Sequence, residues 1–257
     1  MLSMYRKDPE SRTVPGRISR RSPRVWDSVP AQEFAECRTK ARIITHPQPP
    51  FELFETLLWT PAGGYHLLEA HLRRLAGSAD YFTFALDIEN VRRELAAIET
   101  LFPKSLQRVR VSLSRNGKVV LKAEPLSPLS EPCRLGLAAA PIDSSDVFLY
   151  HKTTHRQVYE RARASRPGCD DVLLWNENDE LTESSIANLV VEKGGRLLTP
   201  PVECGLLPGV YRATLLETGE AQEERIRIQD LPACKKLFLA NSVRGMWEVF
   251  WKQSTNH

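Results

Sequence analysis

The sequence predicts a mixed α+β protein that folds in two lobes. Apolar residues recur at helical spacing between residues 67 and 102, and Arg108–Ser114 alternates with period two before an Asn116-Gly117 turn. A second group of short apolar runs follows after residue 150. The chain has 257 residues, 42% of them hydrophobic and 26% charged, which suffices to bury a core in one domain or in two small ones.

Residues 1–45 are predicted to form a basic, partly disordered N-terminal extension. Its first 30 residues alternate Arg, Ser and Pro with few apolar positions, and a short helix is expected at 31–44. Residues 1–25 carry seven basic and two acidic side chains, a balance of +5, which leaves −2 for the rest because the whole chain carries +3. The near-neutral body argues against a nucleic acid as the partner.

The first lobe, residues 46–141, is predicted to combine a small sheet with two helices. The helices are amphipathic, and the hairpin is set by the tight Asn-Gly turn. The expected elements are a strand at 51–59, helices at 67–79 and 91–102, a hairpin of 108–114 with 119–121, and a strand at 135–140.

The second lobe, residues 142–257, is predicted to be larger and to begin with a connection at 142–150. Turn signals at Gly194-Gly195 and Pro208-Gly209 separate its elements. These are helices at 153–165 and 210–217 and strands at 171–175, 186–192, 197–198 and 237–240.

Several classes of protein are disfavoured by composition. No apolar run approaches the roughly 20 residues that span a bilayer, and the first 24 residues lack the apolar core of a signal peptide. We therefore expect a cytoplasmic protein with no membrane partner. The five cysteines are scattered, which suggests neither a zinc site nor a disulfide framework, and no metal is expected.

Five short motifs stand in a fixed order along the chain. They are His71-Leu-Arg-Arg-Leu75, Lys152-Thr-Thr-His-Arg156, Glu183-Ser-Ser-Ile-Ala-Asn-Leu189, Gly205-Leu-Leu-Pro-Gly-Val-Tyr-Arg212 and Leu239-Ala-Asn-Ser-Val-Arg-Gly245. In order and spacing they resemble the fold-type IV pyridoxal-phosphate enzymes, over about residues 50–250. The resemblance implies a two-lobed fold like that of D-amino-acid aminotransferase, with pyridoxal 5′-phosphate between the lobes.

The resemblance also implies which residues bind the cofactor. Lys152 matches the lysine that holds the cofactor covalently and then acts as a base, and Glu183 matches the acidic partner of the pyridine nitrogen. Asn188 is expected to order the backbone. The phosphate is expected at Arg74, at the helix start formed by Gly209, Val210 and Tyr211, and at Ser242, although a serine at a strand end also commonly caps a turn.

One position departs from the pattern. Many relatives carry Asn-Arg three and four residues after the lysine, where this chain has His155-Arg156. A histidine there either stacks near the phosphate or simply packs, so no role is assigned to His155.

Within the family, three short sequence segments are most similar to the 4-amino-4-deoxychorismate lyase domain that some bacteria fuse behind aminodeoxychorismate synthase. These are Phe54-Glu-Thr-Leu-Leu-Trp59, Leu68-Glu-Ala-His-Leu72 and Tyr150-His-Lys-Thr-Thr-His155, and segments at 25–28 and 36–41 resemble the tail and linker of that synthase. The expected reaction makes 4-aminobenzoate and pyruvate, a step of folate biosynthesis.

For this lyase reaction the resemblance points to three further residues. Thr56 is expected to face the substrate and to assist proton transfer, with a strand threonine that only packs as the other interpretation. Arg110 and Arg115 are expected to bind a substrate carboxylate, and an outward-facing hairpin arginine is the alternative for Arg115.

Two other functions stay open on the sequence. One is a PLP-dependent aminotransferase of branched-chain or D-amino acids. The other is a non-catalytic module that keeps the fold and binds a synthase partner. A small-molecule substrate and a homodimer are expected by resemblance to the family, and aminodeoxychorismate synthase is left open as a partner.

Overall fold

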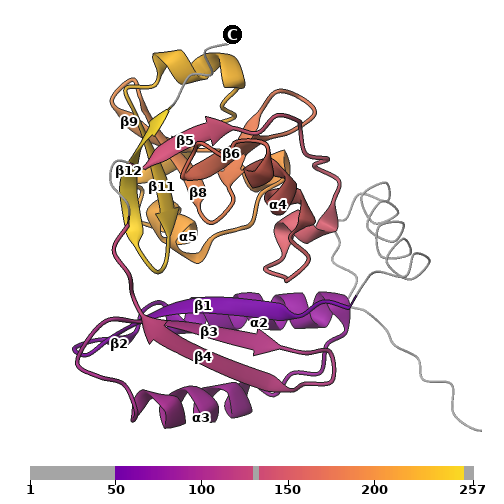
Figure 1. Cartoon of the computed structure of the whole chain (residues 1–257), viewed down its shortest axis with the longest axis vertical. Helices are drawn as coiled ribbons and strands as arrows, with labels where there is room; N and C mark the ends of the chain where they lie inside the picture. Colours follow the sequence, from indigo (N-terminus) through magenta and orange to yellow (C-terminus); the bar gives the residue numbers. More distant parts are fainter. Residues whose placement is uncertain (1–49, 130–132, 252–257) are drawn as a thin grey trace, which may run out of the picture. The chain divides into compact units, whose positions relative to one another are not determined.

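The computed structural model describes residues 50–129 and 133–251, which belong to one compact unit of the chain, 49–257. The predicted extension at 1–45 and its helix at 31–44 lie outside the described residues. Within them the fold is the predicted α+β type, with two separate sheets (Figure 1). No described helix is both long and apolar enough to cross a membrane.

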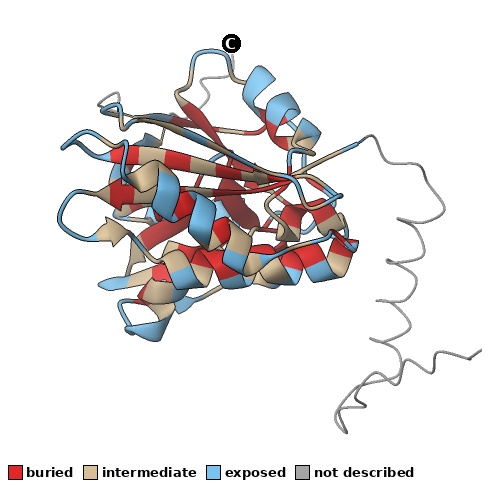
Figure 2. Ribbon diagram, turned by 90° about the horizontal axis from the view of Figure 1, so that it is seen from below, coloured by how far each residue is buried: buried red, intermediate tan, exposed pale blue. Residues whose placement is uncertain are grey.

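The first sheet has four antiparallel strands in the order β2-β1-β3-β4. These are β1 (Leu53–Thr60), β2 (Gly64–Tyr65), β3 (Gln107–Leu113) and β4 (Val119–Pro125), and they are joined by α2 (Leu68–Phe82) and α3 (Ile88–Glu99). Leu72, Val91 and Leu95 of the helices pack against Leu57 and Val109 of the sheet, so both helices cover the same face. Figure 2 shows the resulting mixture of buried and exposed residues along the helices.

Alternation along β1 therefore assigns each residue to one of two faces. Leu53, Glu55, Leu57 and Trp59 are buried, and Glu55 faces α2, where it bonds to His71. Phe54, Thr56, Leu58 and Thr60 point to the opposite face, which carries no helix of this group. That second face is available to form a site.

The second sheet has eight strands in the order β10-β9-β8-β11-β12-β5-β6-β7, and β7 also pairs with β8. The extra pairing closes β8, β11, β12, β5, β6 and β7 into a small barrel. Its core contains Leu135, Leu173, Leu189, Leu239 and Val249. The strands are β5 (Arg134–Leu137), β6 (Asp171–Trp175), β7 (Leu181–Ser184), β8 (Asn188–Lys193), β9 (Arg196–Thr199), β10 (Ala221–Glu223), β11 (Lys236–Asn241) and β12 (Gly245–Trp251).

Two helices and three short 3₁₀ turns connect these strands. They are α4 (Gln157–Ala164), α5 (Val210–Glu217) and 3₁₀ turns at Val147–Tyr150, Val202–Cys204 and Ile228–Ala233. The start of α5 directly after Gly209 is as predicted. The helix expected from residue 153 begins only at Gln157, because Thr153 is extended and forms a β-bridge with Leu53.

Candidate active site

Lys152 lies where the two sheets meet. The backbone N–H of Phe54 donates to the carbonyl of Lys152 over 3.0 Å, and the neighbouring Leu53–Thr153 bridge fixes the segment against β1. Burial and the nearby charge of Arg74 lower the pKa of Lys152 to about 7. An amine with that pKa is substantially uncharged at neutral pH, which a nucleophile or a base requires.

Glu183 is a buried acid on β7. The hydroxyl of Tyr159 donates to its Oε1 over 2.7 Å, and the backbone N–H of Leu207 donates to the same oxygen over 3.1 Å. Burial nevertheless raises the pKa of Glu183 to about 7. The group can therefore hold or release a proton near neutral pH. Tyr159 was not among the predicted residues, and its seven-residue separation from Lys152 carries no motif that would have indicated it.

Asn188 and Gly209 form a close contact at the start of α5. The Asn188 amide donates to the carbonyl of Leu207 over 2.9 Å and to Glu183 over 3.3 Å, so it orders the segment before the helix. A Cβ on Gly209 would lie 1.8 Å from Asn188 Oδ1, so only glycine fits. No side chain caps α5, which leaves the N–H groups of Val210 and Tyr211 available to an anion. The ring of Tyr211 packs against an apolar cluster that includes Val190 and Ala240.

Arg74 is held against the same helix start. Its Nη1 donates to the carbonyl of Pro208 over 3.1 Å, while Nε and Nη2 donate to Glu55 over 2.8 and 2.6 Å. His71 Nδ1 lies 2.7 Å from Glu55 Oε2, the oxygen that also accepts from Arg74 Nη2. Burial alone would raise the pKa of Glu55, but Arg74 and His71 bring it down to about 2. Three of the five guanidinium N–H groups are thus engaged, and two are left for a ligand.

A cavity of about 390 Å³ joins these groups. Its lining includes the predicted Thr56, Arg74, Arg110, Lys152, Glu183, Asn188, Gly209, Val210 and Ser242. The turn at Ser242 is capped by the side chain of Asn241, which accepts from the N–H groups of Val243 and Arg244, and not by Ser242.

Arg115 does not line this cavity, contrary to the expectation that it binds substrate. It donates to the carbonyl of Phe82 over 3.0 Å, and its guanidinium lies 4.8 Å from the centre of the Phe84 ring. These contacts tie the β3–β4 hairpin to α2. His155 packs as well, because its ring stacks on Phe148 with 4.2 Å between centroids.

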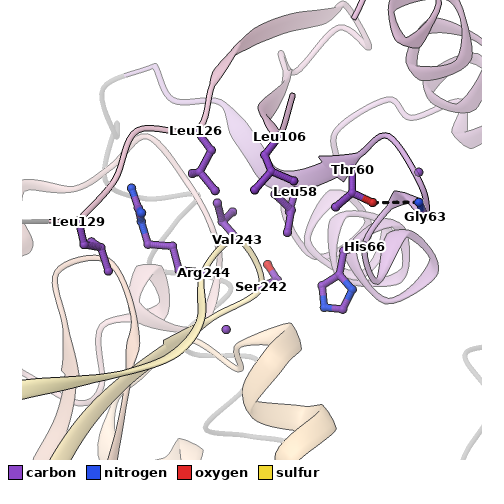
Figure 3. A pocket seen from close by; sticks show the side chains of 12 residues that line it. Leu58, Thr60, Gly63, His66, Leu106, Leu126, Leu129, Ser242, Val243 and Arg244 are labelled. Atoms are coloured by element: carbon purple, nitrogen blue, oxygen red, sulfur yellow. Dashed lines mark hydrogen bonds between the residues drawn. The ribbon is translucent and has the colours of Figure 1, made fainter. Parts of the chain in front are cut away.

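A second cavity of about 570 Å³ adjoins the first, because both are lined by Leu126 and by Ser242, Val243 and Arg244. Its other walls are mainly apolar, from Leu58, Leu106 and Leu129, with Thr60 and His66 beside them (Figure 3). The turn between β11 and β12 is therefore a wall shared by the two cavities.

The smaller cavity is rich in positive charge. Arg108, Arg156 and Arg244 line it beside Arg74, Arg110 and Lys152, whereas Glu124 and Glu183 are its acidic lining residues. Arg108 is paired with Glu124 at 2.5 Å. Arg110, Arg156 and Arg244 form no ion pair with a carboxylate of the described residues. Instead Arg110 stacks on Phe54 at 3.8 Å, and Arg156 donates to the carbonyl of Ser185.

A family model, that of class IV amino-transferases, matches residues 52–250. The chain belongs to this family. A putative aminodeoxychorismate lyase of Schizosaccharomyces pombe is 33% identical over 205 residues, covering 75% of this chain and 86% of that protein. A solved putative amino-acid aminotransferase of Mesorhizobium loti is 38% identical, with a TM-score of 0.74 over 79% of this chain and 100% of that one. The 4-amino-4-deoxychorismate lyase of Pseudomonas aeruginosa is 25% identical, with a TM-score of 0.65 over 78% and 82% of the two chains.

Enzymes of the class IV family use pyridoxal 5′-phosphate, and the groups described above fit it. Lys152 would bind its aldehyde carbon, and Glu183 would face its pyridine nitrogen. The free N–H groups of Arg74 and the uncapped start of α5 would take its phosphate. Glycine at 209 lets the backbone at the start of α5 approach Asn188, where a Cβ would overlap the Asn188 side chain.

Proposed function

We propose that the protein is a PLP-dependent lyase that converts 4-amino-4-deoxychorismate to 4-aminobenzoate and pyruvate. The observation that carries the proposal is the set of three arginines, Arg110, Arg156 and Arg244, that line the cavity without a carboxylate partner among the described residues. One phosphate dianion does not balance the whole cavity. A dicarboxylic substrate supplies the remaining negative charge, whereas a branched-chain amino acid needs an apolar wall for its side chain.

The 33% identical relative supports the same reaction, since its name is that of an aminodeoxychorismate lyase. The reaction balances without a co-substrate. The ring loses a proton from the carbon that carries the amine and the bond to the enolpyruvyl oxygen breaks. The ring becomes aromatic, and the proton ends on the methyl group of pyruvate.

Each step falls to a residue of the cavity. When bound, pyridoxal phosphate supplies an electron sink that acidifies the carbon bearing the substrate amine. The amine of Lys152, with its pKa near 7, takes the proton from that carbon. Glu183, whose pKa is raised to about 7, would hold a proton at the pyridine nitrogen of the bound cofactor, and Thr56, which lines the cavity from β1, would pass a proton to the departing oxygen.

An aminotransferase is the second candidate, because the 38% identical structure carries that name. Purified holoenzyme should release pyruvate and 4-aminobenzoate from aminodeoxychorismate continuously with no keto acid added. Lys152→Ala should abolish both products. Rapid conversion of the cofactor to its amine form by leucine, glutamate or D-alanine, without turnover of aminodeoxychorismate, would establish the aminotransferase instead.

The quaternary structure is part of the proposal. A homodimer is expected because relatives of this type close the substrate side of the site with a loop of the partner, and a synthase partner remains open. Sedimentation analysis over a range of concentrations, together with activity at each, tests the dimer. Full activity of a strictly monomeric species would contradict it.

A further inference from the structure

The cavity face of the first sheet carries its arginines at regular steps away from Lys152. The N–H of Phe54 binds the carbonyl of Lys152, so this position on β1 marks the reacting end. In the β1–β3 register, Arg110 lies opposite Thr56 and Arg108 lies opposite Leu58. Strands advance about 3.3 Å per residue, so the two arginines are roughly 7 Å apart along the strand, with Arg108 the farther from Lys152.

Arg244 joins Arg108 at the far end. Its Nη2 donates to the carbonyl of Ser127 over 2.9 Å, and Ser127 lies just beyond the end of β4. On β4, Glu124 is opposite Arg108, and Pro125 is opposite Gln107. The Arg108 and Arg244 side chains line the same cavity, and burial together with the charge of Arg108 lowers the pKa of Arg244.

The two arginines at this end differ in whether a carboxylate neutralises their charge. Arg108 has Glu124 as an ion-pair partner, but Arg244 has only a backbone carbonyl as its hydrogen-bond acceptor within the described residues. A partly buried guanidinium beside a second cation is costly unless an anion reaches it. Arg244 also stands on the wall that the two cavities share, where a ligand in the smaller cavity would end.

We propose that Arg244, assisted by Arg108, binds the substrate carboxylate that lies farthest from the reacting amine. This inference rests on the proposed function, in which the substrate has a ring carboxylate opposite its amine and a second carboxylate on the enolpyruvyl arm. Arg244 binds the ring carboxylate, which remains part of the product 4-aminobenzoate. Arg110 binds the carboxylate of the enolpyruvyl arm, which is nearer to the reacting amine and leaves with pyruvate.

A pair of ligands of nearly the same shape, one with a carboxylate and one with a neutral amide, tests the assignment. Isothermal titration of the holoenzyme with 4-aminobenzoate and with its uncharged amide, 4-aminobenzamide, measures the preference for the carboxylate. We expect wild type to bind the acid roughly ten- to a hundredfold more tightly than the amide, the usual effect of one charge-assisted pair. Arg244→Met should remove most of this preference, and Arg244→Lys should retain part of it.

Other variants separate binding from folding. Arg244→Gln removes the charge but keeps a donor for Ser127, so it should lose the preference even if Arg244→Met is unstable. Arg110→Met should keep the preference while raising KM for aminodeoxychorismate. Arg161→Met, at an exposed position on α4, should change neither. Equal weakening of acid and amide in both Arg244→Met and Arg244→Gln, or no preference in wild type, would overturn the assignment.

The two proposals fail in different ways. If no pyruvate is released but the preference depends on Arg244, the carboxylate site stands and the lyase reaction is wrong. If pyruvate is released and Arg244→Gln binds acid and amide as wild type does, the lyase reaction stands and the role of Arg244 is wrong.

Discussion

Replacing Arg74 by Met separates the two tasks of this side chain, which are to neutralise Glu55 and to bind a phosphate. The Glu55 carboxylate is only 2% exposed, and the change leaves it with His71 alone of its two present partners. Removing one partner of a buried ion pair costs roughly 3–5 kcal/mol of unfolding free energy. In wild type the pKa of Glu55 is lowered from the ordinary glutamate value of 4.5 to about 2. This shift stabilises the fold fully above pH 4.5, and the contribution is lost as the pH falls towards about 2. Arg74→Met should therefore destabilise the protein at neutral pH and flatten this acid dependence.

The double variant Glu55→Gln/Arg74→Met removes both charges and should recover most of the stability. Its affinity for pyridoxal phosphate should remain lower than that of wild type by roughly ten- to a hundredfold, because the charge-assisted bonds to phosphate are still absent. Urea unfolding measures the first effect, and titration of the cofactor-free protein by its visible absorbance measures the second. Arg73→Met, at the exposed neighbouring position, is the control for both. If the double variant recovers cofactor affinity together with stability, Arg74 acts only through the fold and the phosphate assignment is wrong.

Three further changes test the remainder of the cofactor site. Lys152→Met should eliminate the visible band that borohydride bleaches. It should also stabilise the cofactor-free protein by roughly 2–4 kcal/mol at pH 7, because burial disfavours the charged lysine and lowers its pKa from 10.5 to about 7. This advantage of the variant should disappear as the pH rises from about 7 to 10.5, where the lysine of the unfolded chain also loses its charge. Glu183→Gln should leave cofactor titration nearly unchanged but reduce kcat roughly a hundredfold or more, because the ring nitrogen loses its acidic partner. Gly209→Ala should lose cofactor affinity and roughly 1–3 kcal/mol of stability, since its Cβ would meet Asn188. Gly77→Ala, a helical glycine with open space around the added Cβ, should instead stabilise by about 0.5–1 kcal/mol.

The elements with strong periodicity could be predicted from the sequence. Helices α2 and α3, the β3–β4 hairpin and the start of α5 follow from apolar spacing, from Asn116-Gly117 and from Pro208-Gly209. Strand β7 could not be predicted, because three of its four residues, Thr182, Glu183 and Ser184, are polar although all four are buried, so no hydrophobic pattern marks the strand. The closing strand β12 was missed too, and the turn that leads into it depends on the Asn241 side chain.

In the candidate site too, some residues can be predicted from local sequence patterns and others cannot. Lys152, Glu183, Asn188 and Gly209 lie in local motifs, and the structure brings them to one cavity. Arg108 and Arg244 are separated by more than a hundred residues, and an isolated arginine is ordinarily a solvated surface group. Only the pairing of β1 with β3 and the position of the β11–β12 turn bring them to the same place.

The two faces of β1 explain why the cofactor is easier to identify than the reaction. Glu55 points to α2 and orients Arg74 toward the start of α5, so the helix face of the strand would serve phosphate binding. Thr56 points the other way, into the cavity beside Arg110, so the opposite face would serve the substrate. A lyase and an aminotransferase of this family share the first requirement, because both need the same cofactor. They differ in what the second face must bind, which is two carboxylates in one case and an apolar or smaller side chain in the other. The arginines of β3 and of the β11–β12 turn are therefore the residues on which the choice of reaction depends, and exchanging them should change substrate preference before it changes cofactor binding.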